Sequence, residues 1–199
     1  KKIKHNNVYC FPSSVEVDHF SGNESTAEVV KPDLKNITHP IVGYYGVIDE
    51  RIDLDLIEMT SMKMPEVSFV MIGPICKIEE RDLPRRENIY YLGMKTYDEL
   101  PAYLKSFDFA MMPFALNDST KFISPTKTLE YMCAYKPIIS TKIKDVVRDY
   151  SDCINLIETD EDFVSAIKNP KQNCENRYDE ILENTSWDKT AQEMKLLIQ

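Results

Sequence analysis

The sequence lacks the patterns that mark a metal site, a disulfide-stabilised fold or a membrane span. Its five cysteines are odd in number, scattered and never spaced as Cys-x-x-Cys, which is typical of reduced cytosolic thiols rather than of disulfides or zinc ligands. The three histidines all lie within the first 39 residues, ahead of the first clear strand, so we expect no histidine-based metal cluster. No apolar run approaches the length of a bilayer-spanning helix, and no signal-peptide core is present.

An excess of positive charge is also absent. The 24 basic residues are outnumbered by 33 acidic ones, and the resulting net charge of −9 argues against a nucleic-acid-binding surface. The basic run KKIK at the start is too short to bind much by itself, and we interpret it as a solvated tail. The chain does not begin with methionine, so we expect Lys1 to be an internal position of a longer protein.

The 199 residues divide into three parts by composition. Residues 1–40 are polar and rich in proline, which indicates an interdomain linker, and residues 186–199 form a final helical pattern. Between them, residues 41–185 alternate strand-like and helix-like segments. Strands are expected at 41–48, 68–73, 88–93, 109–114, 137–141 and 154–159. Helices are expected at 53–63, 97–107, 125–135, 160–169 and 175–184.

This alternation predicts an α/β fold with a doubly wound, Rossmann-like parallel sheet of roughly six strands. Short continuous apolar runs such as SFVMIG are typical of strands buried on both faces, as parallel strands are. In such sheets ligands bind beyond the carboxyl ends of the strands. We therefore expect the functional residues in the loops that follow the strands.

The stretch SPTKTLEYMCAYKP carries the strongest candidate site. Ser124 has the character of an N-cap and Pro125 that of a first helical residue, so the N–H groups of Thr126 and Lys127 would be free to bind an anion. Lys127 adds a positive charge. Glu130 follows within the first turn, and a carboxylate suits the two adjacent hydroxyls of a ribose. The competing interpretation is a lysine and a glutamate on a solvated helix face.

A weaker signal is the pair of glycines in VGYYGVIDE. A glycine where a strand ends lets a phosphate approach the backbone, and Gly46 occupies such a place. The spacing is not Gly-x-Gly-x-x-Gly, and a strand-end glycine is as often a turn residue.

Four segments, in order, resemble the C-terminal, donor-binding half of GT-B-fold glycosyltransferases of family 4. NNVYCFPSSVEVDHF resembles the interdomain segment of that family, and IVGYYGVID resembles the first strand and glycine loop of its second domain. SPTKTLEYMCAYKPIIST resembles its donor-site helix, and NTSWDKTAQEM resembles its closing Ser-Trp helix. The resemblance covers nearly the whole chain.

The resemblance implies roles for individual residues. Glu130 matches the second glutamate of the family's Glu-x7-Glu motif, which bonds the donor ribose. Ser124 to Lys127 occupy the place whose amides meet the donor diphosphate, and Gly46 lies in the loop that approaches the same phosphates. Gly93 and Met94 correspond to the region that holds the nucleobase.

The sequence also departs from the family's pattern. The first glutamate of the motif, which holds the transferred sugar, would fall at Phe122. Asn117 or Thr120 would then have to hold the sugar, or this function is absent. The basic pair that clamps the diphosphate would fall near positions 47 and 52, which are valine and isoleucine. Arg51 and Lys127 are the cations that could replace it. A tyrosine, Tyr135, stands where the family has a glycine.

The resemblance predicts the nucleotide-sugar-binding domain of a retaining glycosyltransferase of bacterial surface-polysaccharide synthesis, with no metal and no cofactor. An acceptor-binding domain preceding Lys1 would complete a cytoplasmic enzyme, peripheral to the inner face of the membrane through that domain, and the fragment alone would be inactive. Two alternatives stay open. One is a catalytically lapsed scaffold of the same fold. The other is a receiver or flavodoxin-like signalling module, although the strands FVMIG and FAMMPF end without the aspartate that a receiver needs.

Overall fold

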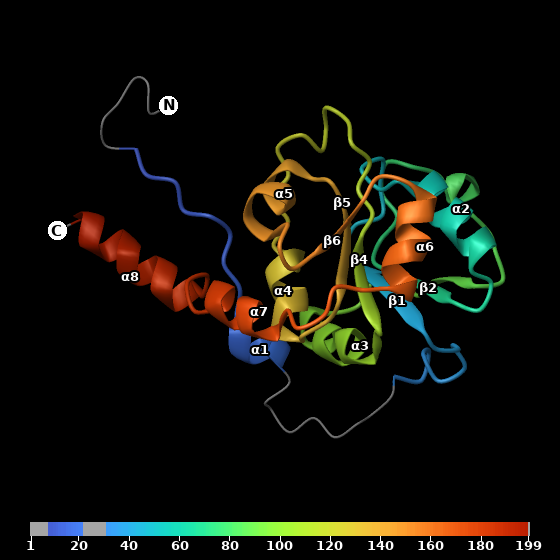
Figure 1. Cartoon of the computed structure of the whole chain (residues 1–199), viewed down its shortest axis with the longest axis horizontal. Helices are drawn as coiled ribbons and strands as arrows, with labels where there is room; N and C mark the ends of the chain where they lie inside the picture. Colours follow the sequence, from blue (N-terminus) through green and yellow to red (C-terminus); the bar gives the residue numbers. More distant parts are fainter. Residues whose placement is uncertain (1–7, 22–30, 199) are drawn as a thin grey trace.

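The computed structural model describes residues 8–21 and 31–198, and its centre is a six-stranded parallel sheet (Figure 1). The strand order is β3-β2-β1-β4-β5-β6, which confirms the predicted doubly wound arrangement. The strands are β1 (Ile41–Tyr45), β2 (Ser68–Ile72), β3 (Ile89–Tyr91), β4 (Phe109–Met112), β5 (Ile138–Thr141) and β6 (Asn155–Ile157). Each lies inside a segment that the sequence predicted as a strand.

The central strands β1 and β2 are buried along their whole length because helices cover both faces of the sheet. Every residue of β1 and β2 is buried, and Val42 of β1 pairs with Phe69 on one side and with Phe109 on the other. The next residue of β1, Gly43, has to be a glycine because a Cβ there would lie 2.2 Å from the Phe107 ring. The sheet therefore forms the rigid centre from which the loops at its carboxyl edge extend.

The helices pack in two layers. In Figure 1, α2 (Leu54–Lys63) and α6 (Asp160–Lys168) cover one face, while α3 (Leu100–Ser106), α4 (Lys127–Cys133) and α5 (Lys144–Tyr150) cover the other. On the first face, Phe163 of α6 meets Phe69 of the sheet edge-to-face at 6.1 Å. Outside these layers lie α1 (Val17–Ser21), α7 (Glu175–Leu182) and α8 (Trp187–Ile198). The two 3₁₀ turns are η1 (Glu80–Asp82) and η2 (Tyr97–Glu99).

The helix expected at 125–135 is shorter than the sequence predicted. It begins at Lys127, with Thr126 in the N-cap position and no side-chain cap, so the assignment of Ser124 as the N-cap is wrong. At its other end Tyr135 takes the left-handed conformation, with φ +51°. The N–H of Tyr135 donates to the carbonyl of Met132, and that of Lys136 donates to Tyr131. These two bonds form a Schellman motif, which explains why the helix stops two residues early.

The helix expected at 97–107 is divided in two. Thr96 and Glu99 form a reciprocal capping box around η2, and α3 then starts afresh at Leu100 with Pro101 in its first turn. Two short helices, α1 and α5, were not predicted.

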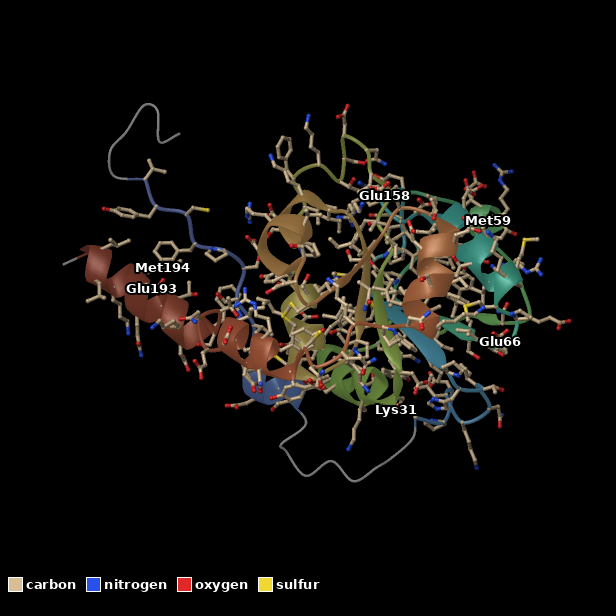
Figure 2. All side chains as sticks on the ribbon, viewed as in Figure 1. Lys31, Met59, Glu66, Glu158, Glu193 and Met194 are labelled. Atoms are coloured by element: carbon tan, nitrogen blue, oxygen red, sulfur yellow. The ribbon has the colours of Figure 1, made fainter. Side chains whose placement is uncertain are left out.

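The segments around Val15 and Thr185, near the two ends of the chain, pair beside the sheet. The N–H of Val15 donates to the carbonyl of Thr185 at 3.0 Å, and the hydroxyls of Ser14 and Thr190 lie 2.7 Å apart. Helix α8 extends away from the sheet, and its labelled side chains Glu193 and Met194 lie far from the layered body (Figure 2). Among the described residues, no helix combines the length and apolar character needed to cross a membrane.

Candidate functional site

Three adjacent strands are each followed by a glycine with positive φ. Gly46 follows β1, Gly73 follows β2 and Gly93 lies two residues beyond β3, with φ values of 145°, 143° and 68°. The N–H of Gly46 donates to Ile72, and the N–H of Gly73 donates to the carbonyl of Gly93, both at 2.8 Å. These glycines let the loops at the carboxyl edge of the sheet pack backbone against backbone.

A cleft of about 230 Å³ opens at this edge. It is lined by residues at and just after the ends of β1 and β2, by the segment after β3 and by α4, namely 45–47, 72–74, Met94, Lys95, Tyr97, Leu100, Lys127 and Glu130. The structure thus brings together four residues that the sequence singled out. They are Gly46, Met94, Lys127 and Glu130.

Glu130 is held by a tyrosine that the sequence did not single out. The hydroxyl of Tyr45, the last residue of β1, donates to Oε2 of Glu130 at 2.8 Å. Burial raises the pKa of the Glu130 carboxyl, while the Tyr45 hydrogen bond and the charge of Lys127 act in the opposite direction. Glu130 is therefore a half-buried acid with a neutral partner at its side, rather than one on a solvated helix face.

Lys127 reaches across the glycine that ends β1. A Cβ on Gly46 would lie 2.5 Å from Cε of Lys127 and 3.0 Å from its Nζ. Burial lowers the pKa of this ammonium, and Glu130 is the one nearby charge that opposes the change. Nζ makes no hydrogen bond or ion pair with any residue that the structure describes. A largely desolvated cation without a partner is costly unless an anion joins it.

Helix α1 supports one wall of the cleft. The imidazole of His19 stacks on the ring of Tyr97 at 4.2 Å and 3°, and its Nε2 lies 3.2 Å from the Tyr97 carbonyl oxygen. Phe20 meets the same Tyr97 ring edge-on at 5.6 Å and lies parallel to Tyr45 at 6.5 Å. Part of the segment interpreted as a linker thus packs behind two cleft residues.

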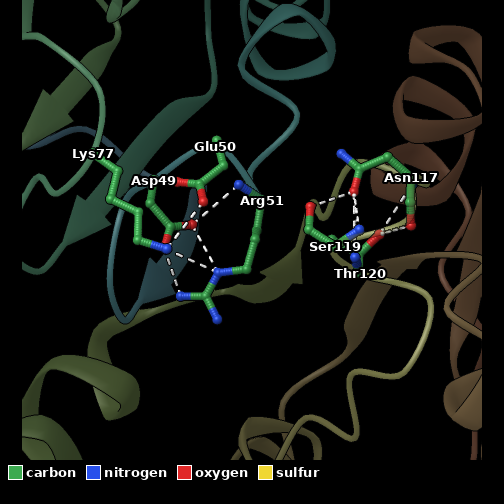
Figure 3. A network of polar contacts seen from close by, with 7 residues as sticks. All are labelled: Asp49, Glu50, Arg51, Lys77, Asn117, Ser119 and Thr120. Atoms are coloured by element: carbon green, nitrogen blue, oxygen red, sulfur yellow. Dashed lines mark hydrogen bonds and ion pairs between the residues drawn. The ribbon is translucent and has the colours of Figure 1, made fainter.

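Arg51 is engaged elsewhere (Figure 3). Its Nε donates to both carboxylate oxygens of Asp49 at 2.9 Å, and its Nη2 donates to Oδ2 at 2.6 Å. Asp49 is buried, and although burial acts to raise its pKa, these bonds hold the pKa below its usual value. The ion pair of Lys77 with Glu50 lies beside it. Arg51 is therefore paired with Asp49 and does not line the cleft, whose cations are Lys127 and Lys95.

Asn117 and Thr120 form a closed turn (Figure 3). Oδ1 of Asn117 accepts from the N–H and hydroxyl of Ser119 at 2.9 and 2.6 Å. The Thr120 hydroxyl accepts from the Asn117 N–H at 3.0 Å and donates to the Ala115 carbonyl. Both side chains thus have internal partners, and neither lines the cleft. Ser124, Thr126 and Gly93 also lie outside its lining, although Gly93 contacts Gly73 through its carbonyl.

The structure adds cleft residues that the sequence reasoning missed, chiefly Tyr45, Gly73, Lys95 and Tyr97. Gly73 could have been found, because it ends a strand as Gly46 does. Lys95 is paired with Asp33 at 2.6 Å, which leaves Lys127 as the unpaired cation of the lining. Within residues 8–21 and 31–198, no group of three or more metal-ligating side chains comes together.

A protein-family model described as "Glycosyl transferases group 1" matches residues 39–172. TuaH of Bacillus subtilis (strain 168), whose name assigns it to teichuronic acid biosynthesis as a glycosyltransferase, is 23% identical over 184 residues. That match covers 89% of this chain and 46% of TuaH, so the chain spans about half the length of this relative.

Two solved structures share the fold at low identity. HepE of Anabaena, in complex with UDP and glucose, has a TM-score of 0.73 at 12% identity, covering 93% of this chain and 55% of HepE. The C-terminal domain of LpcC, a glycosyl transferase group 1 family protein from Francisella tularensis, has a TM-score of 0.51 at 16% identity. That match covers 92% of this chain and 95% of the LpcC domain, which confirms the predicted fold as that of a C-terminal domain.

Proposed function

This chain belongs to the glycosyl transferases group 1, and from that membership we propose that its cleft binds the nucleotide diphosphate of a sugar donor. The full-length protein would transfer the sugar to a hydroxyl group of an acceptor. Membership in this family also excludes the receiver or flavodoxin-like alternative.

The observation that carries the proposal is the unpaired ammonium of Lys127 over bare glycine backbone. A diphosphate is the anionic part of a nucleotide-sugar, and it would supply the partner that Lys127 lacks. Gly46, Gly73 and Lys127 line the same cleft, so phosphate oxygens bound there would lie beside the ammonium. When the sugar departs, negative charge grows on the diphosphate, and a cation fixed at that place stabilises it.

Glu130 is suited to the ribose. Its Oε2 already accepts from Tyr45, and the second oxygen, Oε1, accepts no hydrogen bond from the described residues. Ribose hydroxyls are donors, so the carboxylate can bind both of them side by side. The nucleobase would then lie toward Met94, whose side chain is 76% exposed at the rim of the cleft.

The rest of the enzyme is expected to lie outside this chain. Because the chain spans about half of TuaH and of HepE, we infer that the remaining half binds the acceptor and that this domain alone binds donor and transfers nothing. The name of TuaH supports an acceptor in a bacterial surface polysaccharide, which would place the full-length protein at the inner face of the membrane. UDP is the first nucleotide to test, since HepE was solved with it.

Titration calorimetry with UDP and GDP tests the proposal. We expect one of them to bind, and Glu130→Gln to weaken that binding about 10- to 100-fold, the effect of losing a charge-assisted pair of hydrogen bonds. Glu183→Gln, on the exposed end of α7, is the matched control and should bind as the wild type does. Equal affinities for wild type and Glu130→Gln would overturn the proposal.

A second candidate is a scaffold that kept the fold and lost the chemistry. It is favoured by Phe122, which is 83% exposed where the family has a glutamate, and by Val47, which lines the cleft where a basic residue is expected. If the full-length protein binds neither UDP nor GDP, this candidate replaces the enzyme.

A further inference from the structure

We propose that Tyr45 is a positioning residue for the donor, whose hydroxyl fixes the Glu130 carboxylate so that its free oxygen faces the ribose. This inference rests on the proposed function and extends it to a residue that does not itself need to touch the ligand.

The ring of Tyr45 is fixed on both sides. Tyr45 is 2% exposed at the end of β1, immediately before Gly46. Tyr131 meets its ring edge-to-face at 5.1 Å, and Phe20 lies parallel to it at 6.5 Å. A ring enclosed in this way has one orientation, so its hydroxyl is a fixed donor for Oε2 of Glu130 at 2.8 Å.

Glutamate needs such a partner because its long side chain has many rotamers. Fixing a glutamate side chain costs conformational entropy, and a cleft that fixes it beforehand spares the ligand that cost. The Tyr45 bond engages Oε2 alone and leaves Oε1 for a ribose hydroxyl. Preorganisation of the carboxylate therefore follows from one buried hydrogen bond.

The chemistry of the partner matters as well. A lysine or arginine at position 45 would neutralise Glu130, whereas a tyrosine donates a hydrogen bond and leaves the carboxylate its charge. Burial raises the pKa of the Tyr45 hydroxyl well above its usual value, and the charge of Glu130 raises it further, so this donor keeps its proton. When Glu130 is ionised, this arrangement gives the ribose a charged acceptor, which forms stronger bonds than a neutral one.

Other groups face Glu130. Lys127 on the same helix and His19 of α1 lower the pKa of Glu130, as the Tyr45 hydrogen bond does. Glu130 in turn raises the pKa of Tyr97 from η2 and of Tyr131 and Cys133 from its own helix. None of these donates a hydrogen bond to the carboxylate, so the Tyr45 hydroxyl is the described donor that Tyr45→Phe would remove. Its loss should raise the pKa of Glu130 further, and the carboxylate would take up a proton at a higher pH.

The experiment is a calorimetric titration of wild type and Tyr45→Phe with UDP at several values between pH 5 and pH 8. We expect Tyr45→Phe to bind about 3- to 10-fold more weakly at pH 8, the effect of one lost hydrogen bond, and the ratio to widen as the pH falls. Because both proteins meet the same UDP at each pH, the titration of UDP itself cancels in the ratio. Tyr178→Phe is the matched control, since Tyr178 is equally buried and its hydroxyl bonds only the carbonyls of Lys136 and Cys153.

A double variant separates positioning from general damage to the fold. In a Glu130→Gln background, Tyr45→Phe should cause little further loss, because Tyr45 acts through the carboxylate. An equal loss in both backgrounds, or a ratio independent of pH, would overturn the inference while leaving the proposed function intact. If the wild type does not bind UDP or GDP, or if Glu130→Gln alone binds as the wild type does, it is the proposed function that fails.

Discussion

A Cβ atom on Gly73 would lie 1.8 Å from the carbonyl oxygen of Gly46. The two loops that follow β1 and β2 therefore touch backbone to backbone, and no side chain can relieve the contact by moving. Gly73 also has φ +143°, which other residues rarely adopt. We predict that Gly73→Ala lowers the free energy of unfolding by more than about 2 kcal/mol. Urea unfolding followed by circular dichroism measures the change.

Gly93→Ala is the control for this prediction. Gly93 has φ +68°, but a Cβ there would meet nothing within 4 Å. Its cost should be that of the backbone conformation alone, about 1 kcal/mol. Similar losses for the two substitutions would mean that the contact between the loops is not what requires glycine at position 73.

Tyr135, at the C-terminal end of α4, has a backbone conformation that glycine adopts more easily. Its φ of +51° costs energy, but its hydroxyl donates to Oδ1 of Asp179 at 2.6 Å. In an Asp179→Ala background, where that bond is absent, we predict that Tyr135→Gly raises the free energy of unfolding by about 1 kcal/mol. In the wild-type background the gain should be smaller, because the hydrogen bond is lost too. A destabilisation in the Asp179→Ala background would contradict this explanation.

The sheet could be predicted from the sequence because its strands are short apolar runs between turn residues, and few other structures produce that pattern. The helices α1 and α5 could not, since they have five and seven residues and α5 buries only Val146. A helix with one buried residue shows no apolar stripe. The early end of α4 depends on the left-handed conformation of Tyr135, which nothing in the residue type suggests.

Part of the candidate site could also be predicted from the sequence. Lys127 and Glu130 could be predicted from their place in the first turn of a helix, and their roles as ligands stay predictions. Tyr45 was overlooked because a tyrosine in a buried strand is indistinguishable from core, and only the position of Glu130 relative to β1 shows what its hydroxyl does. Arg51 was proposed because it adjoins position 52, where the family has a basic residue, whereas the structure pairs it with the carboxylate of Asp49, two residues away.

Asp33 connects the segment before β1 to the cleft loop and should give the protein a pH-dependent stability. Burial acts to raise its pKa, but hydrogen bonds from Lys95 and Tyr103 outweigh burial and leave the pKa below the ordinary 3.8. A carboxylate with a lowered folded-state pKa stabilises the fold above its unfolded-state pKa and loses that effect as the pH falls through the folded-state value.

We therefore predict that Asp33→Asn costs up to about 1 kcal/mol at neutral pH, since the pair is partly exposed. The difference from wild type should shrink in acid and vanish below the lowered pKa of Asp33. Urea unfolding between neutral and acidic pH measures both curves, with the exposed loop variant Asp118→Asn as the control. A difference between Asp33→Asn and wild type that stays constant through the acidic range would show that Asp33 contributes through something other than its charge.

Lys127 should distinguish ligands by their phosphates. Its ammonium lies over Gly46 without a partner, so we predict that Lys127→Met weakens UDP binding about 10-fold or more and leaves the weak binding of uridine unchanged. Methionine keeps most of the length of the side chain and removes the ammonium group. Burial lowers the pKa of Lys127, so its ammonium loses its proton at a lower pH than that of an ordinary lysine. UDP binding should therefore weaken at that lower alkaline pH, and Lys127→Met should lose this pH dependence. Calorimetry with both ligands measures the effect, and Lys168→Met, on the exposed face of α6, controls for the loss of one positive charge from the protein. Equal losses for UDP and uridine would mean that Lys127 supports the shape of the cleft rather than binding the diphosphate.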